Sequence, residues 1–229
     1  MGTLQHDGDT FNPNLLNPLL WYRSDRGVTL AGNKVSQWSD LSGNNIHLTQ
    51  SDDARRPLYV ATGYNGGVRP LLRFDGTAAY MATALISQAQ PTHVFIRTIW
   101  SSFVGGAYNH CIIDGYGSNS SAIFRLHDSN VATIYAGASG PALTVPTSAD
   151  QIIEAYFSGA SSIGALNGET YTDASNAGTS AFNGLTLCCH GGSHVAERCA
   201  PADVVEVIVF TSFIPQKFRD RLIAYMQRG

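Results

Sequence analysis

Short segments in which apolar and polar residues alternate, each followed by turn residues, recur along this sequence. In residues 93–102, alternate positions including Val94, Ile96 and Trp100 share one face. Segments 111–114, 122–127 and 132–135 follow and are separated by Gly, Ser and Asn. Such closely spaced short strands predict an all-β chain folded as an antiparallel β-sandwich.

Two stretches show how these strands are expected to end. Residues 35–45 (VSQWSDLSGNN) open as a strand in which Ser36 and Trp38 face opposite to Val35 and Gln37. A polar turn follows, where Gly43 tolerates positive φ. Residues 71–81 (LLRFDGTAAYM) show a similar order: a strand, then an Asp-Gly turn, then an aromatic residue. Residues 28–38 are expected to form a β-hairpin.

The order of these stretches carries a family resemblance. LLWYRSD, VSQWSDLSGNN, RPLYV and LLRFDGTAAYM, with LTL, VVEVIVF and a final helix near the end, resemble the laminin-G-like branch of the concanavalin A-like lectin/glucanase domains. The resemblance covers residues 19–229. It implies a concanavalin A-like jelly roll with a short C-terminal helix, of a kind found in phage and bacterial surface proteins. That fold hosts lectins, hydrolases, lyases and structural modules.

The sequence predicts an N-terminal arm over residues 1–18 and one sandwich domain over residues 19–229. The arm either wraps a body or neighbouring subunit or is a loosely held terminus. Residues 45–64 are expected to be mostly loop. Asn167-Gly168 predicts a tight hairpin, with Thr170 and Tyr171 in its return strand. A helix is expected after Pro215, with its apolar stripe at Phe218, Leu222, Tyr225 and Met226.

Charge and hydropathy exclude two classes of partner. The formal net charge is −3, and Lys and Arg cluster only at Arg55-Arg56 and in the terminal helix, which argues against nucleic-acid binding. No apolar run approaches the ~18 residues of a membrane span. The N-terminus lacks the basic start and apolar centre of a signal peptide. We therefore expect a protein used outside the cell or on a virion surface, without a signal peptide.

The catalytic motifs of related carbohydrate-active enzymes are absent from the sequence. The Glu-x-Asp-x-x-Glu strand of related glucanases has no counterpart, and Glu154, Glu169, Glu197 and Glu206 stand alone. Related alginate-type lyases carry Gln-x-His, whereas this chain has Gln151-Ile152-Ile153. No Gly-x-Ser-x-Gly segment occurs. The expectation is a non-enzyme, with a carbohydrate-active enzyme of unfamiliar site as the alternative.

Soft ligands gather in one short segment, which contains Cys188, Cys189, His190, His194 and Cys199. Zinc is one interpretation, but adjacent strand residues point to opposite faces and cannot easily both bind one ion. The other interpretation is a disulfide between Cys199 and either Cys188 or Cys189, with Cys189–Cys199 as the candidate pair.

Calcium is a second candidate ligand, whereas no other cofactor is expected. Asp40 and Asn44, together with Asn45, could supply oxygens from one turn, and Asp75 from the other. Calcium prefers more than one carboxylate. The alternative is a structural Asx turn, in which the aspartate bonds nearby backbone N–H groups.

A sugar-binding face should combine aromatic rings with polar side chains. Tyr116, Arg125, His127 and Tyr135 are the candidates, and Arg125 and His127 share one strand face by alternation. The alternative is an ordinary solvated sheet face.

The leading hypothesis is a non-catalytic adhesion or decoration module on a phage or other virus particle. Its partner would be a surface glycan or another virion or surface protein. Assembly into a homo-oligomer is a further option. A structural virion subunit without ligand is the further alternative.

Overall fold

The computed structural model describes residues 11–64, 69–101, 110–116, 121–125, 130–192, 194–195 and 198–228. The strands are β1 (Leu20–Arg23), β2 (Val28–Ala31), β3 (Lys34–Trp38), β4 (Leu48–Thr49), β5 (Leu58–Tyr64), β6 (Arg69–Asp75), β7 (Met81–Ala82), β8 (Thr92–Trp100), β9 (His110–Asp114), β10 (Ala122–Arg125), β11 (Val131–Tyr135), β12 (Ser139–Thr144), β13 (Asp150–Phe157), β14 (Ile163–Leu166), β15 (Thr186–Leu187) and β16 (Pro201–Phe210). The helices are the short 3₁₀ turns η1 (Pro13–Leu16), η2 (Asp53–Arg55) and η4 (Gly159–Ser161), and α1 (Gln216–Arg228).

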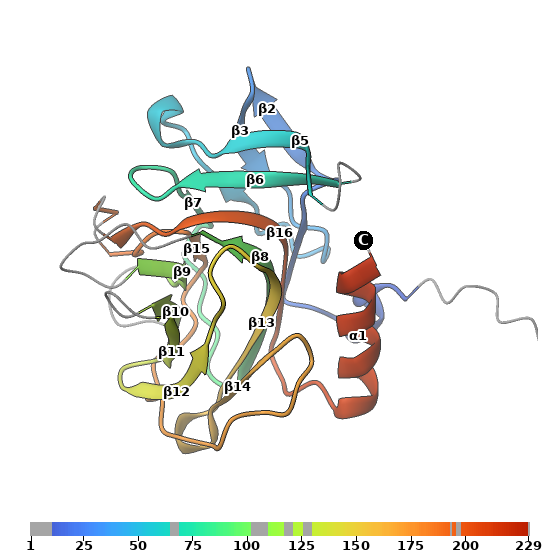
Figure 1. Ribbon diagram of the computed structural model, residues 1–229, viewed down its shortest axis with the longest axis vertical. Helices are drawn as coiled ribbons and strands as arrows, with labels where there is room; N and C mark the ends of the chain where they lie inside the picture. The colour runs from blue at the N-terminus through green and yellow to red at the C-terminus, as the bar shows by residue number, and fades with distance from the viewer. Residues whose placement is uncertain are drawn as a thin grey trace, which may run out of the picture.

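The strands form an antiparallel β-sandwich of jelly-roll type (Figure 1). Hydrogen-bonded neighbours follow the order β12-β11-β10-β9-β15-β7-β4-β3-β5-β6-β16-β8-β13-β14, with β1 paired to β16 and β2 to β3. The two ends of this path, β12 and β14, contact each other. The strand path therefore folds back on itself and encloses one large apolar core.

The long central strands are buried on both faces. In β8, Val94, Ile96 and Trp100 enter the main core, whereas Phe95 enters a second cluster beneath α1. Strand β16 divides in the same way, with Val207 in the main core and Ile208 under the helix. This two-sided burial explains why VVEVIVF is almost continuously apolar.

Helix α1 stands along the outer face of β8, β13 and β16 (Figure 1). Its buried residues are Arg219, Leu222, Ile223 and Met226. The predicted helix is confirmed, but its predicted stripe is partly wrong. Phe218 is 37% exposed and Arg219 is buried in its place, because Arg219 pairs with a carboxylate on the sheet. No described helix is long and apolar enough to cross a membrane.

The predicted hairpin of β2 and β3 is confirmed, but the predicted alternation in β3 is wrong. Thr29 pairs with Gln37 and the next residue pairs with Val35, so Ser36 is the extra residue of a β-bulge. A bulge interrupts the two-residue period. Val35 and Trp38 are consequently both buried, and Ser36 and Gln37 both lie outside the core.

Two further segments differ from the sequence prediction. Residues 45–64 contain β4, η2 and β5 rather than mostly loop. Asn167 and Gly168 have the positive φ values of a tight turn, 52° and 81°, but Thr170 and Tyr171 form no strand. In the arm, Phe11 is buried against α1 and has Tyr225 at 5.9 Å between ring centroids. The described end of the arm is therefore packed on the body.

Candidate functional site

A shallow groove of about 680 Å³ lies over the outer side of β2, β3, β4 and β7. We call it the Tyr80 groove. Its described lining residues are Thr29, Ser36, Gln37, Thr49, Gln50, Ser51, Arg56, Tyr80, Ala82, Thr83, Ala84, Tyr116 and His194. Among these described residues three carry rings and none carries a carboxylate. Its volume falls within the roughly 300–1,000 Å³ typical of small-molecule sites.

The floor of the groove follows from the strand geometry. The bulge in β3 turns both Ser36 and Gln37 outward. Beside them, Thr49 of β4 and Ala82 of β7 face out because Leu48 and Met81 fill the core. Hydroxyl and amide groups consequently lie on the floor, where they can bond a hydroxylated ligand.

The rings of Tyr80 and His194 form a stacked pair on one side of the groove. Their centroids are 4.1 Å apart and their planes differ by 8°. The guanidinium of Arg55 lies 5.8 Å from the Tyr80 centroid. Burial, with the nearby charge of Arg55, lowers the pKa of His194. The imidazole is therefore neutral at pH 7, and the pair offers a flat, uncharged surface.

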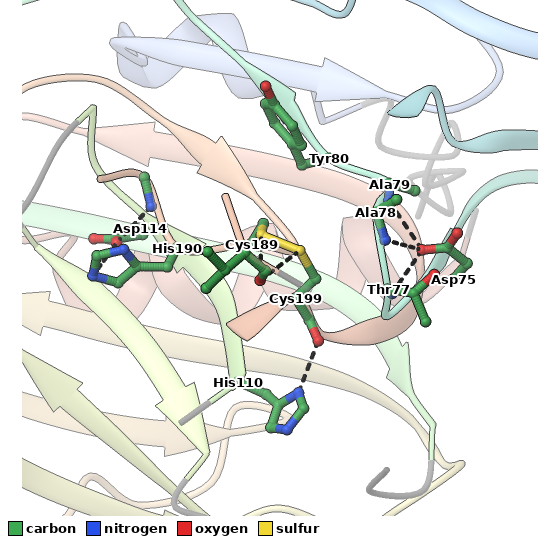
Figure 2. The surroundings of a disulfide bond; sticks show 12 residues. Asp75, Thr77, Ala78, Ala79, Tyr80, His110, Asp114, Cys189, His190 and Cys199 are labelled. Atoms are coloured by element: carbon green, nitrogen blue, oxygen red, sulfur yellow. Dashed lines mark hydrogen bonds and ion pairs between the residues drawn. A yellow bond between two sulfur atoms is a disulfide. The ribbon is translucent and has the colours of Figure 1, made fainter. Parts of the chain in front are cut away.

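A disulfide closes the loop that carries His194. Cys189 and Cys199 are joined at 2.11 Å (Figure 2). Asp114, at the end of β9, accepts a hydrogen bond from Gly191 N at 2.9 Å. The Cys189–Cys199 disulfide joins the two ends of the loop, and the Gly191–Asp114 hydrogen bond ties the loop to β9. Together these bonds position His194 against Tyr80.

Tyr116 is the most exposed ring of the groove, with 49% of its surface open. Its backbone is fixed by Asn183, which accepts from Tyr116 N at 2.9 Å and donates to Tyr116 O at 3.0 Å. Gly184 has φ +143°, and a Cβ there would lie 2.8 Å from Tyr116 Cβ. The sequence therefore needs glycine beside this ring.

Two further side chains brace the groove. Gln50 donates to Tyr80 O at 3.2 Å and accepts from Asp52 N at 3.0 Å. Arg56 donates from Nε to Gln50 O at 2.8 Å and from Nη2 to Ser51 O at 2.7 Å. These bonds join the end of β4 to the Tyr80 segment.

The structure describes the side chains of two of the four candidate sugar-binding residues, Tyr116 and Tyr135, and places only one of them in the groove. Tyr116 lines the groove. Tyr135 packs beside Cys111 and Ala122 and is not among the described groove residues. Arg125 ends β10, but its side chain and all of His127 lie outside the described residues. Tyr80 was recognised in the sequence only as the aromatic residue after a turn, and His194 only as a metal candidate.

The calcium candidates act as structural hydrogen-bond partners. Asp40 accepts from Trp21 N at 3.0 Å, from Ser42 N at 2.9 Å and from Ile46 N at 3.2 Å. Asn44 donates to Leu19 O at 2.9 Å. These contacts are those of the Asx-turn alternative.

The other aspartate, Asp75, has a similar environment. Its Oδ1 accepts from Thr77, Ala78 and Ala79 N–H groups at 2.8–2.9 Å (Figure 2). Partial burial would raise the pKa of Asp75, but these N–H groups lower it overall. Among the described residues, no three His, Cys, Asp or Glu side chains gather so as to hold a metal ion. The disulfide also removes Cys189 and Cys199 from the zinc set.

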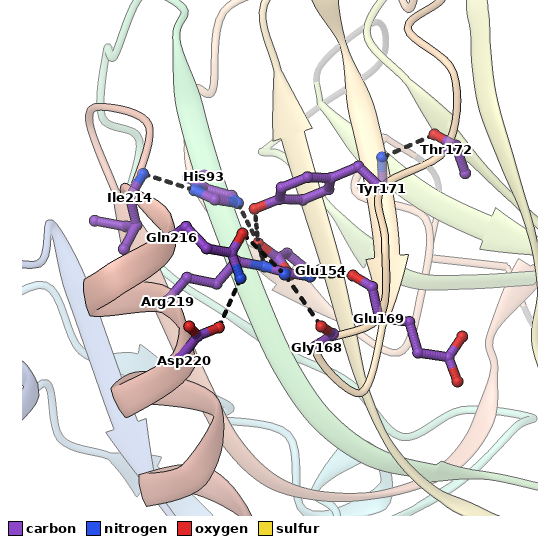
Figure 3. Close-up of polar contacts among 11 residues, drawn as sticks. His93, Glu154, Gly168, Glu169, Tyr171, Thr172, Ile214, Gln216, Arg219 and Asp220 are labelled. Atoms are coloured by element: carbon purple, nitrogen blue, oxygen red, sulfur yellow. Dashed lines mark hydrogen bonds and ion pairs between the residues drawn. The ribbon is translucent and has the colours of Figure 1, made fainter.

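A buried polar cluster that no sequence pattern indicates lies beneath α1. We call it the helix lock: His93, Glu154, Tyr171 and Arg219 (Figure 3). Arg219 Nε lies 2.8 Å from Glu154 Oε2, and His93 Nε2 lies 2.9 Å from Glu154 Oε1. Tyr171 also donates to Glu154. Glu154, which belongs to no catalytic motif in the sequence, therefore has three partners from distant parts of the chain.

The helix lock has a defined charge state. His93 Nδ1 accepts from Ile214 N at 3.1 Å, which leaves the imidazole proton on Nε2 beside Glu154. Burial lowers the pKa of His93. For Glu154, burial would raise the pKa, but hydrogen bonds from His93 and Tyr171 and the charge of Arg219 lower it. At neutral pH the cluster holds a carboxylate, a guanidinium and a neutral histidine.

A second isolated glutamate is also buried. Glu206 of β16 accepts from Trp21 Nε1 at 2.8 Å. Burial raises its pKa despite this bond and the charges of Arg69 and Arg23. Both Glu154 and Glu206 are fully buried, so neither presents a carboxylate to a ligand. Each of them instead bonds a side chain from another part of the fold.

Comparison with known proteins supports the fold. No protein-family model and no curated protein sequence matches this chain. Among solved structures, it is similar to the binding domain of Paraclostridial mosquitocidal protein 1, with TM-score 0.62, 10% identity, and 92% of this chain and 52% of that chain covered. It is also similar to the botulinum neurotoxin serotype D ligand-binding domain in complex with N-acetylneuraminic acid, with TM-score 0.63, 10% identity, and 93% and 51% covered.

A third solved structure has nearly the same extent as this chain. Domain 4 of AbnA, a GH43 extracellular arabinanase from Geobacillus stearothermophilus, in complex with arabinotriose, has TM-score 0.61 and 10% identity. The match covers 90% of this chain and 98% of that one, whereas the chain spans about half of the two toxin domains. At these identities the comparisons establish a lectin-like β-sandwich fold.

Proposed function

We propose that this chain is a non-catalytic glycan-binding module and that the Tyr80 groove is its binding site. The observation that carries the proposal is the combination of the stacked Tyr80–His194 pair, the exposed Tyr116 ring and the outward amide and hydroxyl groups in one groove. Aromatic faces pack against the apolar faces of sugar rings, while polar groups bond their hydroxyls.

Two further observations support this proposal. Leu85 and Val195 are 66% and 40% exposed, and each directly follows a groove residue in the chain, which is typical of an interaction surface. Two of the similar structures hold sugars, arabinotriose and N-acetylneuraminic acid. Since the described lining of the groove carries no carboxylate, we propose binding without glycoside cleavage.

The setting that we propose is extracellular or on a virion surface, where the module would serve adhesion or decoration. The Cys189–Cys199 disulfide supports an oxidising environment. We keep the laminin-G-like assignment as part of this proposal, carried by the sequence stretches that resemble that branch. Neither assignment affects the test of the groove.

The test is binding to a broad array of glycans and bacterial polysaccharides, with calcium and with chelator. Tyr116→Ala is compared with Tyr135→Ala, a matched removal of a ring outside the groove. We expect selective binding that Tyr116→Ala weakens by about tenfold or more, whereas Tyr135→Ala preserves it. Silence across the array, equal loss in both variants, or release of reducing ends from a bound polysaccharide would contradict the proposal.

A further inference from the structure

A second hollow of about 420 Å³ adjoins the Tyr80 groove. We call it the Arg73 hollow; it is lined by Lys34, Arg56, Arg73, Asp75, Ser101 and Asp203, with apolar residues between them. Arg56 lines both hollows. Ala79 lines the second and Tyr80 the first, and β3 contributes to both. The two hollows are therefore neighbours along the same strands.

The charges of the Arg73 hollow balance one another. Arg73 donates from Nε and Nη2 to the two oxygens of Asp203, each at 2.8 Å. Lys34 and Arg56 both contact Asp53, at 3.2 and 3.1 Å. Asp75 is held by three backbone N–H groups. No strong net charge remains to select an anion or a cation.

The hollow still offers hydrogen-bonding groups of both kinds. The side chain of Arg73 is 51% exposed, and within the described part of the chain its Nη1 has no bonding partner. Asp75 accepts its three backbone bonds through Oδ1 alone, and the Ser101 hydroxyl also lines the hollow. Donors and acceptors side by side without excess charge suit hydroxyl groups, which both donate and accept.

We propose that the Tyr80 groove and the Arg73 hollow form one continuous site for a neutral oligosaccharide of several residues. One sugar packs on the aromatic rings, and a later sugar of the same chain bonds Arg73 and Asp75. This inference rests on the proposed function and deepens it. The ligand that the combined site recognises would be a segment of a glycan chain, rather than a single sugar or an acidic group.

The test measures affinity against chain length. The probes are disaccharides and hexasaccharides of the neutral cello-, xylo-, arabino- and N-acetylchito-oligosaccharide series, titrated calorimetrically at about 0.15 M and 0.5 M NaCl. For the series that binds, we expect the hexasaccharide to bind about tenfold more tightly than the disaccharide. Both affinities should be insensitive to salt, because no ion pair forms with the ligand.

The matched variants separate the two hollows. Arg73→Gln alone leaves Asp203 unpaired, so Arg73→Gln/Asp203→Asn is used as well, which keeps the net charge unchanged. It should weaken hexasaccharide binding about fivefold and leave disaccharide binding unchanged. Tyr116→Ala should weaken both lengths. Arg228→Gln, at an exposed site outside both hollows, should change neither.

The outcomes distinguish the inference from the proposed function. Equal affinity for both lengths, an equal effect of the double variant on both, or a preference for acidic polysaccharides that salt abolishes would overturn the continuous neutral site. If disaccharide binding then still depended on Tyr116, the proposed function would stand alone. If no saccharide bound, the proposed function itself would fall.

Discussion

The Tyr80 groove and the helix lock lie in the same sandwich but differ in chemistry and access. The helix lock contains His93, Glu154, Tyr171 and Arg219, residue types common in active sites, yet His93 and Glu154 are fully buried. The groove contains rings, amides and hydroxyls, and it is open. Reactive residue types therefore locate a site only when a ligand can reach them. In this chain the charged cluster attaches a helix to the sheet.

The largest expected effect is on the helix lock. Arg219→Met leaves the buried Glu154 carboxylate without its guanidinium, which should lower the free energy of unfolding by about 3–5 kcal/mol. Urea denaturation monitored by tryptophan fluorescence measures it, with the exposed Arg228→Met as control. Glycan binding by the remaining folded protein should be unchanged. A loss below about 1 kcal/mol would contradict the assigned role of the cluster.

Next in size is removal of the disulfide beside the groove. The Cys189→Ser/Cys199→Ser variant opens a link with a sequence separation of 10, which should cost about 2–3 kcal/mol of stability. Because the loop positions His194 against Tyr80, glycan binding should also weaken, by about threefold to tenfold. Wild-type protein treated with dithiothreitol should behave in the same way. Unchanged affinity after reduction would show that the groove does not need this loop in place.

The smallest expected effect is a pH dependence that belongs to the helix lock. Because the folded pKa of His93 lies below its usual value, the unfolded chain takes up a proton first as pH falls through about 6.5. Stability should be full above that pH and fall below it, by at most about 1.4 kcal/mol per pH unit for this group. The loss should level off below the folded pKa.

Two buried carboxylates, Glu154 in the helix lock and Glu206 in a separate site, extend this dependence in opposite directions. Glu154, with a lowered pKa, contributes stability above about pH 4.5 that is lost as pH falls through its folded pKa. Glu206, with a raised pKa, contributes stability at low pH that is lost as pH rises through its folded pKa. Urea titrations between pH 5 and 7.5 should show a shallower acid loss in His93→Gln than in wild type. An unchanged slope would contradict the assignment.

Much of the fold could be predicted from the sequence. The alternation in β8, the turns at Gly43 and Asn167-Gly168, and the spacing in α1 reflect periods of two or about 3.6 residues, which are local properties of the chain. The short strands between turns were sufficient to indicate an antiparallel sandwich. Tyr116, a candidate by residue type, lines the groove that we propose as the site.

Only the tertiary structure brings the residues of the candidate site together. The groove unites β3, β7, Tyr116 and the loop of His194, and no local pattern reports which distant segments become neighbours. The bulge at Ser36 depends on pairing with β2, so alternation alone wrongly places Val35 and Trp38 on opposite faces, whereas both are buried. No local pattern joins Glu154 to Arg219, which follows 65 residues later, and burial of a charge depends on a partner that only folding supplies.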